Sequence, residues 1–185
     1  MERWEEALTE LLAGAIPVLV LTGPVGAGKT RTAEAVARAL SDGGHRVGGV
    51  VSPRVLRHGE TVGYRVRDLA TGEERPLCAL TPPGMRFRRF YFAPEGIAFA
   101  REALRRAARE AEVVVTDEVG PLELRGHGFA PGITAARAAG VPLVITARPH
   151  LVDAVLEWLG ARGRARIVAV PRPPCPGLDA GSGQR

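Results

Sequence analysis

The stretch from Ile16 to Ser41 reads IPVLVLTGPVGAGKTRTAEAVARALS and decides the fold. Residues 16–22 form a short apolar run rich in branched side chains, which is typical of a strand buried on both faces of a sheet. The glycines over 23–28 end this run and predict a loop. Apolar residues then recur at i, i+3, i+4 and i+7, which predicts a helix from about Lys29 to Ser41. The stretch therefore predicts a strand, a glycine loop and a helix in direct succession.

The glycine loop, GPVGAGKT over residues 23–30, fits the pattern G-x-x-x-x-G-K-[ST] of a phosphate-binding loop (P-loop) between a strand and a helix. Glycines let backbone N–H groups curve around a polyphosphate, and the helix N-terminus adds partial positive charge. Lys29 would bridge the β and γ phosphates, and Thr30 would ligate Mg²⁺. The residues expected to bind the phosphates are Gly23, Pro24, Val25, Gly26, Ala27, Gly28, Lys29, Thr30 and Arg31. The alternative is a glycine-rich helix entry that binds no ligand.

The basic residues support the phosphate interpretation. Lys29 is the only lysine among 25 basic residues, and it stands where a slim ammonium fits inside a phosphate loop and a planar guanidinium does not. The formal net charge of +5 favours anionic partners such as nucleotides, nucleic acid or acidic surfaces, without choosing among them.

The composition is that of an ordinary globular protein. Of the 185 residues, 45% are hydrophobic and 24% are charged, which excludes a disordered or low-complexity chain. At this length we expect one domain over residues 1–170, which begins with an amphipathic helix over 1–13. Residues 171–185 are rich in proline and glycine, so we expect a disordered tail.

After the opening stretch, short apolar runs alternate with amphipathic segments. We expect strands at 47–52, 113–117, 141–146 and 166–170, and helices at 94–111, 129–139 and 150–159. From about 60 to 80 polar and apolar residues alternate, which predicts an antiparallel hairpin. This order predicts an α/β fold in three layers, with a mostly parallel central sheet and one inserted antiparallel hairpin.

An acidic pair, Asp117 and Glu118, ends the predicted strand over 113–117. In an open α/β sheet the carboxyl ends of the strands form the crevice in which ligands bind. Asp117 would hold Mg²⁺ as a Walker B acid does, and Glu118 would orient and activate the attacking water. The alternative is a solvated acidic turn.

Cysteine and histidine indicate neither a disulfide framework nor a zinc site. Cys78 and Cys175 are far apart in sequence, and the four histidines are scattered. We expect Cys78 in the core, Cys175 in the tail, and a reducing cytoplasm as the location. The longest apolar stretch is far shorter than the roughly 20 residues that span a bilayer, and the acidic start is wrong for a signal peptide, so we expect no membrane contact.

Several arginines are weaker candidates. Arg148 follows the strand over 141–146, where it would reach a γ-phosphate and stabilise charge in the transition state, and a solvated arginine is the equal alternative. Arg54 and Arg57 follow the strand over 47–52 and would also reach phosphate, although most loop arginines are merely solvated. The segment Arg86–Phe92 mixes arginines with aromatic residues, which would stack a base or grip single-stranded nucleic acid. It is one short patch without a recognisable nucleic-acid-binding module, so nucleic acid is the less favoured partner.

Two longer motifs resemble one known family. DEVGPLEL over residues 117–124 is similar to the run D-E-[IV]-G-P-[ML]-E-L of the THEP-type, or cancer-related, nucleoside-triphosphatases, which are small P-loop NTPases. GYRVRDLATGEE over residues 63–74 is similar to the hairpin of that family. The resemblance extends from about residue 18 to 158. It implies the P-loop NTPase fold and Mg²⁺-dependent hydrolysis of ATP, GTP and other nucleoside triphosphates with broad base tolerance.

The chain departs from the family pattern in three places. SPRVL over residues 52–56 stands where the family tends to have Thr-Pro-Glu-Val-Arg, so an acid is missing there. The chain contains no asparagine, so the family's Asn-Arg segment near the C-terminus is absent. The helix before residue 16 is an addition to the usual pattern.

These observations predict a monomeric or weakly oligomeric nucleoside-triphosphatase. Its catalytic residues would be Lys29, Asp117, Glu118 and Arg148, and its metal ligands Thr30 and Asp117. One alternative is a small-molecule or nucleotide kinase with the arginines around Arg86 as a closing lid. The other is a nucleotide-switched binding protein with slow hydrolysis.

Overall fold

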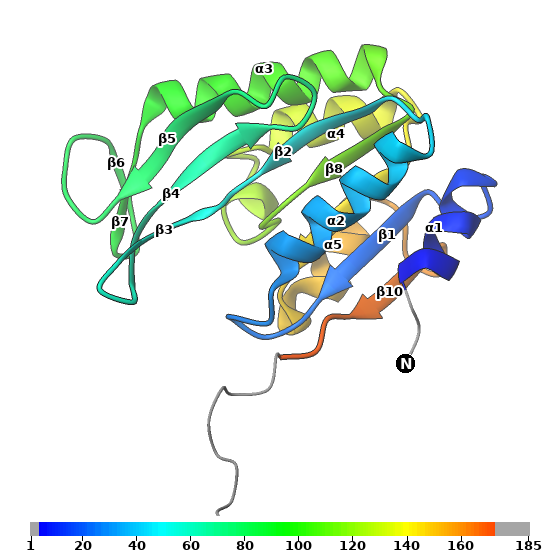
Figure 1. The fold of residues 1–185 in the computed structure, drawn as a ribbon, viewed down its shortest axis with the longest axis horizontal. Helices are drawn as coiled ribbons and strands as arrows, with labels where there is room; N and C mark the ends of the chain where they lie inside the picture. The colour runs from blue at the N-terminus through cyan, green and yellow to red at the C-terminus, as the bar shows by residue number, and fades with distance from the viewer. Residues whose placement is uncertain (1–3, 173–185) are drawn as a thin grey trace, which may run out of the picture.

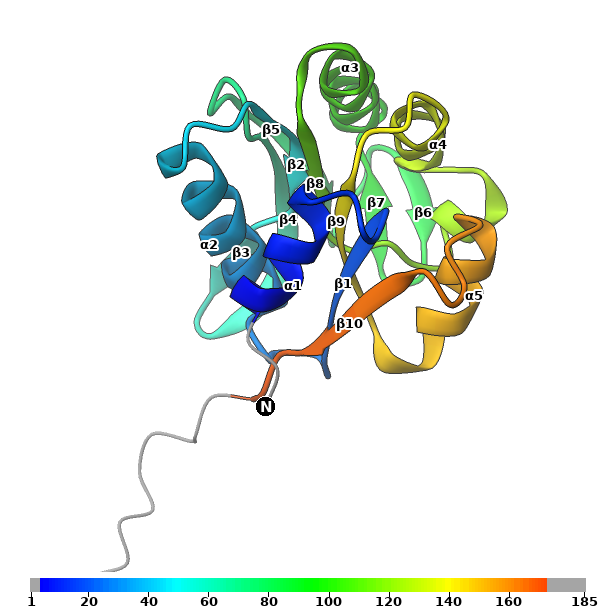
Figure 2. The same cartoon turned by 90° about the vertical axis from the view of Figure 1, so that its right-hand side faces the viewer.

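Five parallel strands form the centre of the sheet, in the order β10-β1-β9-β8-β2 (Figure 1 and Figure 2). The computed structural model describes residues 4–172. The central strands are β1 (Val18–Thr22), β2 (Val47–Val51), β8 (Val113–Thr116), β9 (Leu143–Ala147) and β10 (Ala165–Ala169). Every residue of β8 and β9 is buried, as expected for parallel strands with both faces covered.

Helices cover both faces of these strands (Figure 2). On one face lie α1 (Trp4–Leu12) and α2 (Lys29–Asp42), and on the other α3 (Pro94–Glu110), α4 (Ala130–Ala138) and α5 (Val152–Trp158). Alternate residues of β1 point into two separate cores: Leu19 packs with the α2 side and Val20 with the α3 side. The predicted three-layer α/β fold with a parallel central sheet is confirmed.

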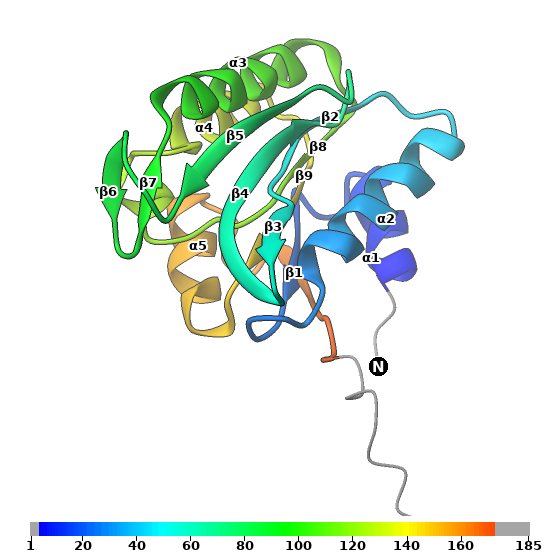
Figure 3. The same cartoon turned by 60° about the vertical axis from the view of Figure 1, so that its left-hand side comes forward.

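Antiparallel strands extend the sheet beyond β2 (Figure 3). The predicted hairpin is present as β4 (Glu60–Asp68) and β5 (Glu74–Ala79), and β4 pairs with β2. The structure adds two pieces to it, β3 (Arg54–Arg57) on β4 and a second hairpin of β6 (Met85–Phe87) and β7 (Phe90–Phe92) on β5. The added strands have three or four residues each. That is too short for an alternation of apolar and polar residues to be recognised, particularly among so many arginines.

Most of the predicted helices and strands lie within two residues of the observed ones. The segment 150–159 instead begins with a short 3₁₀ helix, η2 (Pro149–Leu151), before α5, and another, η1 (Glu123–Arg125), follows β8. No helix in the described part of the chain is long and apolar enough to cross a bilayer. Cys78 is buried, as expected, whereas Cys175 and most of the predicted tail lie outside the described residues.

Candidate active site

The predicted P-loop connects β1 to α2 at the carboxyl edge of the sheet. Gly26 and Gly28 have φ values of +84° and +92°, a left-handed conformation that glycine adopts at no steric cost. Gly28 caps α2 and, as a glycine, has no side chain to bond to the first N–H groups of the helix. The loop therefore presents backbone donors and a helix N-terminus to the same space, which suits an anion.

Lys29 lies under this loop and is only 6% exposed. Its Nζ donates hydrogen bonds to the carbonyl oxygens of Gly23, at 2.9 Å, and of Pro24, at 3.1 Å. Burial lowers the pKa of the ammonium, and the negative charges of Glu118 and Asp117 oppose that effect. The ammonium thus spans the start of the loop and faces the acidic pair.

Asp117 is fully buried and accepts hydrogen bonds from three elements. The Thr30 hydroxyl of α2 donates to Oδ2 at 2.6 Å, and the Thr146 hydroxyl of β9 donates to Oδ1 at 2.5 Å. The backbone N–H of Ser52, just after β2, donates to Oδ2 at 3.3 Å. The fold thus brings together Thr30 and Asp117, which the sequence predicts as metal ligands, although 87 positions separate them.

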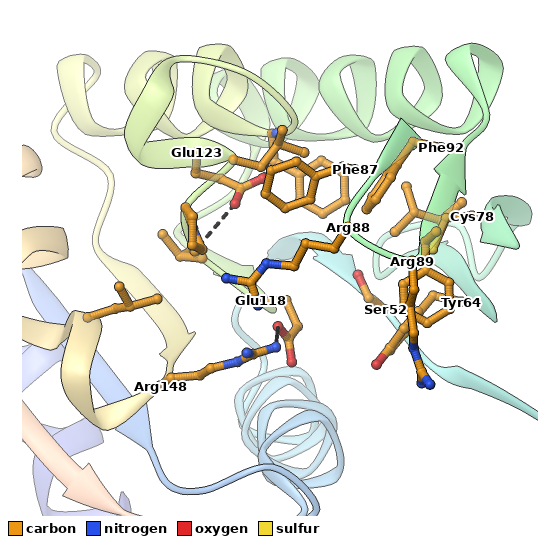
Figure 4. Close-up of a pocket in the computed structure, with 18 of the residues that line it drawn as sticks. Ser52, Tyr64, Cys78, Phe87, Arg88, Arg89, Phe92, Glu118, Glu123 and Arg148 are labelled. Carbon is orange, nitrogen blue, oxygen red and sulfur yellow. Dashed lines mark hydrogen bonds and ion pairs between the residues drawn. The ribbon is translucent and has the colours of Figure 1, made fainter. Parts of the chain in front are cut away.

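Glu118 turns the chain sharply at the end of β8. Its φ of +59° is uncommon for a residue with a side chain, and its N–H donates to the Thr146 hydroxyl at 2.8 Å. Burial raises the pKa of its carboxyl, as does the neighbouring charge of Asp117. An Arg148 guanidinium nitrogen lies 3.8 Å from Glu118 Oε2 and lowers that pKa (Figure 4). The structure therefore places Arg148 beside the predicted base.

The oxygen atoms of Thr30 and Asp117 fit the magnesium ion that the family resemblance implies. A carboxylate and a hydroxyl are hard oxygen donors of the kind that Mg²⁺ prefers, usually with phosphate oxygens completing the shell. Asp117 is a buried carboxylate held by hydroxyl and amide donors, with no basic side chain against it in an ion pair of the described structure. The described residues contain no group of three or more His, Cys, Asp or Glu side chains that would hold a metal by themselves.

The remaining basic candidates lie at different places. Arg54 is exposed on β3, yet its positive charge lowers the pKa of both Lys29 and Glu118, so it lies near the acidic pair. Arg57 lies at the exposed far end of β3. Arg31 lines a separate groove of about 390 Å³ beside the start of α2.

Sequence reasoning missed three residues of the site. Thr146 fixes both Asp117 and the backbone of Glu118, and the Ser52 hydroxyl is buried with no hydrogen-bond partner among the described residues. Both stand at the carboxyl ends of parallel strands, and that position is the signal that would have found them. The third, Glu123, is 5% exposed and accepts N–H bonds from Gly120 and Phe129 at 3.0 and 3.3 Å. Burial raises its pKa to about 7.

A cavity of about 440 Å³ opens beside Glu118 (Figure 4). Glu118 and Arg148 lie at one side of the cavity, and Phe87 and Phe92 of the β6–β7 hairpin lie at the other. Val25 of the P-loop and Tyr64 of β4 also line it. The segment Arg86–Phe92 therefore forms a wall of the site. Two of its arginines lie over its own rings, with the guanidinium carbon of Arg89 4.8 Å from the centroid of Phe90 and that of Arg88 5.9 Å from the centroid of Phe87.

A parallel sheet with a glycine loop after β1 and an acidic pair after β8 defines a P-loop nucleotide-binding protein. The model of the family described as NTPase matches residues 18–172, and the chain belongs to that family. The predicted family and enzyme class, a P-loop NTPase, are thereby confirmed.

Individual relatives agree with this assignment. Nucleoside-triphosphatase THEP1 of Thermococcus kodakarensis is 34% identical over 140 residues, 73% of this chain and 78% of that protein. The crystal structure of THEP1 from Aquifex aeolicus matches with a TM-score of 0.65 and 19% identity over 83% of this chain and 90% of that one. A human cancer-related nucleoside triphosphatase matches with a TM-score of 0.63 and 24% identity over 82% and 87%. These two structures share the fold.

Proposed function

We propose that this protein hydrolyses nucleoside 5′-triphosphates, ATP and GTP among them, to the diphosphate and phosphate in a Mg²⁺-dependent reaction. The observation that carries the proposal is the 2.6 Å contact between Thr30 of the P-loop helix and Asp117, with Glu118 next in the chain. This contact supports the proposal, because it brings the P-loop helix against the strand end that carries the acidic pair.

The phosphates would lie in the P-loop, where backbone N–H groups and the α2 N-terminus bind them. The Lys29 ammonium, freed from the carbonyls of Gly23 and Pro24, would contact the β and γ oxygens. A magnesium ion, when bound, would be held by Thr30 and Asp117 and would neutralise charge on the same phosphate oxygens. Arg148 would add positive charge near the γ-phosphate, where negative charge develops.

Glu118 would be the general base. Its backbone is fixed by Thr146, and its side chain points to the cavity that meets the P-loop at Val25 (Figure 4). A water between the carboxylate and the γ-phosphate would give its proton to Glu118 as it attacks. A raised pKa makes the carboxylate a stronger base than an ordinary glutamate.

The nucleoside half would lie in the groove beside the start of α2, which Trp4, Arg31, Thr32 and Arg172 line. The polyphosphate enters the loop along the helix N-terminus, so its nucleoside end leaves the loop on this side. An indole and two guanidinium groups offer flat surfaces on which any base stacks. This lining suits broad base tolerance.

The test is phosphate release from ATP, GTP, CTP and UTP in a buffer without any acceptor. Glu118→Gln should retain nucleotide affinity and lose about 10²- to 10⁴-fold in turnover. Lys29→Ala should weaken binding itself in calorimetry. Undiminished phosphate release from Glu118→Gln would remove Glu118 from the mechanism, and undiminished affinity of Lys29→Ala would contradict the phosphate site.

A further inference from the structure

The cavity beside Glu118 continues away from the P-loop, beyond the place where the γ-phosphate of a bound nucleotide would end. Its volume of about 440 Å³ is that of a small-molecule site, far more than one attacking water needs. The groove proposed above for the nucleoside half of the triphosphate is a separate one, which Ala27 and Gly28 of the loop line, whereas Val25 lines this cavity. The cavity therefore has room for a second molecule that faces the γ-phosphate.

The end of the cavity next to Glu118 is cationic. Arg148 reaches it from the end of β9, and the side chain of Arg88 extends toward it from the tip of the β6–β7 hairpin (Figure 4). Within the described residues Arg88 forms no ion pair, and its φ of +55° is a strained conformation for a residue with a side chain. Two guanidinium groups that converge here suit a phosphate.

The other end of the cavity is aromatic. Phe87 pairs with Phe90 across the hairpin, and Phe92 lies two residues further on, so the pleat puts these three rings on one face. All three line the cavity together with Tyr64. Tyr64 contacts Phe90 edge to face at 5.5 Å between ring centroids, and Phe87 contacts Phe92 in the same manner at 6.3 Å. Rings of this kind bind a flat heterocycle.

Two buried polar groups also face this space. The Ser52 hydroxyl is 2% exposed and has no hydrogen-bond partner in the described structure, although it lines the cavity. A buried hydroxyl without a partner is costly, so a ligand that bonds to it would gain affinity. The Glu123 carboxyl lines the same cavity and is able to bond to a polar edge of the ligand.

We propose that this cavity binds a nucleoside 5′-monophosphate, which accepts the γ-phosphoryl group in place of water. Its base would lie among Phe87, Phe92 and Tyr64, and its phosphate between Arg88 and Arg148. This inference rests on the proposed function, because the same bound triphosphate is the phosphoryl donor. Hydrolysis is then the reaction of the site when only water occupies the cavity.

The transfer step balances without a further reactant. A phosphate oxygen of the monophosphate forms a bond to the γ-phosphorus as the bond from that phosphorus to the β–γ bridging oxygen breaks. The products are two nucleoside diphosphates. A dianionic phosphate has no proton to lose when it attacks, so this step needs no base, whereas attack by water needs Glu118.

The experiment supplies γ-labelled ATP with AMP, GMP, CMP or UMP and follows label in the nucleoside diphosphate. We expect label in the diphosphate of at least one monophosphate. Phe87→Ala and Arg88→Ala should each lower the transfer about tenfold or more. The matched controls, Tyr91→Ala and Arg86→Ala, alter residues that pair with each other on the opposite face of the same hairpin and should leave transfer within about twofold.

Glu118→Gln separates this inference from the proposed function. It should lose hydrolysis while transfer to the monophosphate falls less than about tenfold, because only water needs the base. Absence of label in all four diphosphates, with phosphate release intact, would overturn the acceptor site and leave hydrolysis standing. The acceptor site would also be overturned if the control variants lost as much transfer as Phe87→Ala and Arg88→Ala. It would be overturned as well if Phe87→Ala weakened the binding of ATP in the absence of a monophosphate, since the base of ATP would then occupy the cavity.

Discussion

Glu118 must be ionised to accept a proton from water, and its pKa is raised by burial and by the charge of Asp117. The turnover number should therefore fall as the pH falls through this raised pKa. The acidic limb of its pH profile should lie above the ordinary glutamate value of 4.5. Turnover measured at saturating nucleotide from pH 5 to pH 9 checks this, because kcat reports the bound complex.

Substitution of Arg148 tests whether ionisation of Glu118 causes the acidic limb of the pH profile. Its positive charge lowers the pKa of Glu118, so Arg148→Ala should move the acidic limb to higher pH in addition to slowing the reaction. Arg125→Ala, an exposed arginine of η1, is the matched control and should leave the limb in place. If the limb of Arg148→Ala coincides with that of the unaltered protein, a group other than Glu118 controls the rate.

Glu123 makes folding depend on pH. Burial raises its pKa from 4.5 to about 7, so the folded state holds a proton that the unfolded state has released between these values. The free energy of unfolding should fall as the pH rises through this window, by roughly 3 kcal/mol, and then stay level above it. Urea unfolding at pH 5 and pH 8 measures the difference.

The Glu123→Gln variant cannot titrate at this position. It should lose most of that pH dependence, even if the missing carboxylate oxygen weakens one of the bonds from Gly120 and Phe129 at both pH values. The quantity compared is the change in the free energy of unfolding between pH 5 and pH 8 in the unaltered protein and in the variant. A loss of stability that is the same at both pH values does not affect this comparison. Equal differences in the two proteins would mean that the carboxyl is ionised throughout the range.

At the scale of elements, α3 lies unusually close to β2. A Cβ added at Gly48 would come within 2.5 Å of the Cβ of Ala107, and within 3.2 Å of that of Ala111. Gly48→Ala should therefore overpack this contact and lower the free energy of unfolding by about 1–3 kcal/mol. Denaturant unfolding of the variant at a single pH is the measurement.

A second substitution tests whether the contact itself is the cause. Ala107→Gly removes the methyl group that the new Cβ would meet, so the double variant should be more stable than the sum of the two single effects predicts, by about 1 kcal/mol. Ala107→Gly alone should cost about 1 kcal/mol, because glycine weakens a helix. If the two single effects on the free energy of unfolding simply add in the double variant, Gly48 is needed for its backbone conformation and not for the close contact with Ala107.

The sequence predicts the elements whose pattern is local and misses those whose pattern is not. Residues 16–41 contain a strand, a loop and a helix, each with its own periodicity, and they fold as predicted. The β6–β7 hairpin and β3 have no such period. These strands form because β4 and β5 present backbone edges with which β3 and β7 pair.

The candidate site divides in the same way. Strand-end chemistry was enough to predict that Thr30, Asp117 and Glu118 meet, because parallel strands end at one edge of the sheet. The strand-end position of Thr146 marks it as a candidate, but its bonds to Asp117 and Glu118 depend on which residues lie across the sheet. The bonds of Glu123 to Gly120 and Phe129 depend on the path of the following loop, and one sequence contains neither kind of information. The cavity lined by β4 and the second hairpin was equally beyond prediction, since it arises only where these two elements meet Glu118.

For the whole molecule, the site lies where the P-loop, the start of α2 and the ends of β8 and β9 meet. A bound triphosphate would contact all of these parts. A ligand that binds only the folded state stabilises it, by about 2.7 kcal/mol at one hundred times its dissociation constant. For a chain of this length that corresponds to a rise in Tm of roughly 5–10 °C.

A non-hydrolysable ATP analogue with Mg²⁺ should therefore raise the Tm, and the rise should grow with the logarithm of the analogue concentration. Lys29→Ala should lose most of the rise, whereas Arg109→Ala, an exposed arginine at the end of α3, should keep it. Chelating the Mg²⁺ with EDTA should reduce the rise as well, because Thr30 and Asp117 would then bind the phosphates without the ion between them. A rise that survives both Lys29→Ala and EDTA would mean that the analogue binds outside the P-loop, and the phosphate site, the metal ligands and the base would all have to be sought elsewhere.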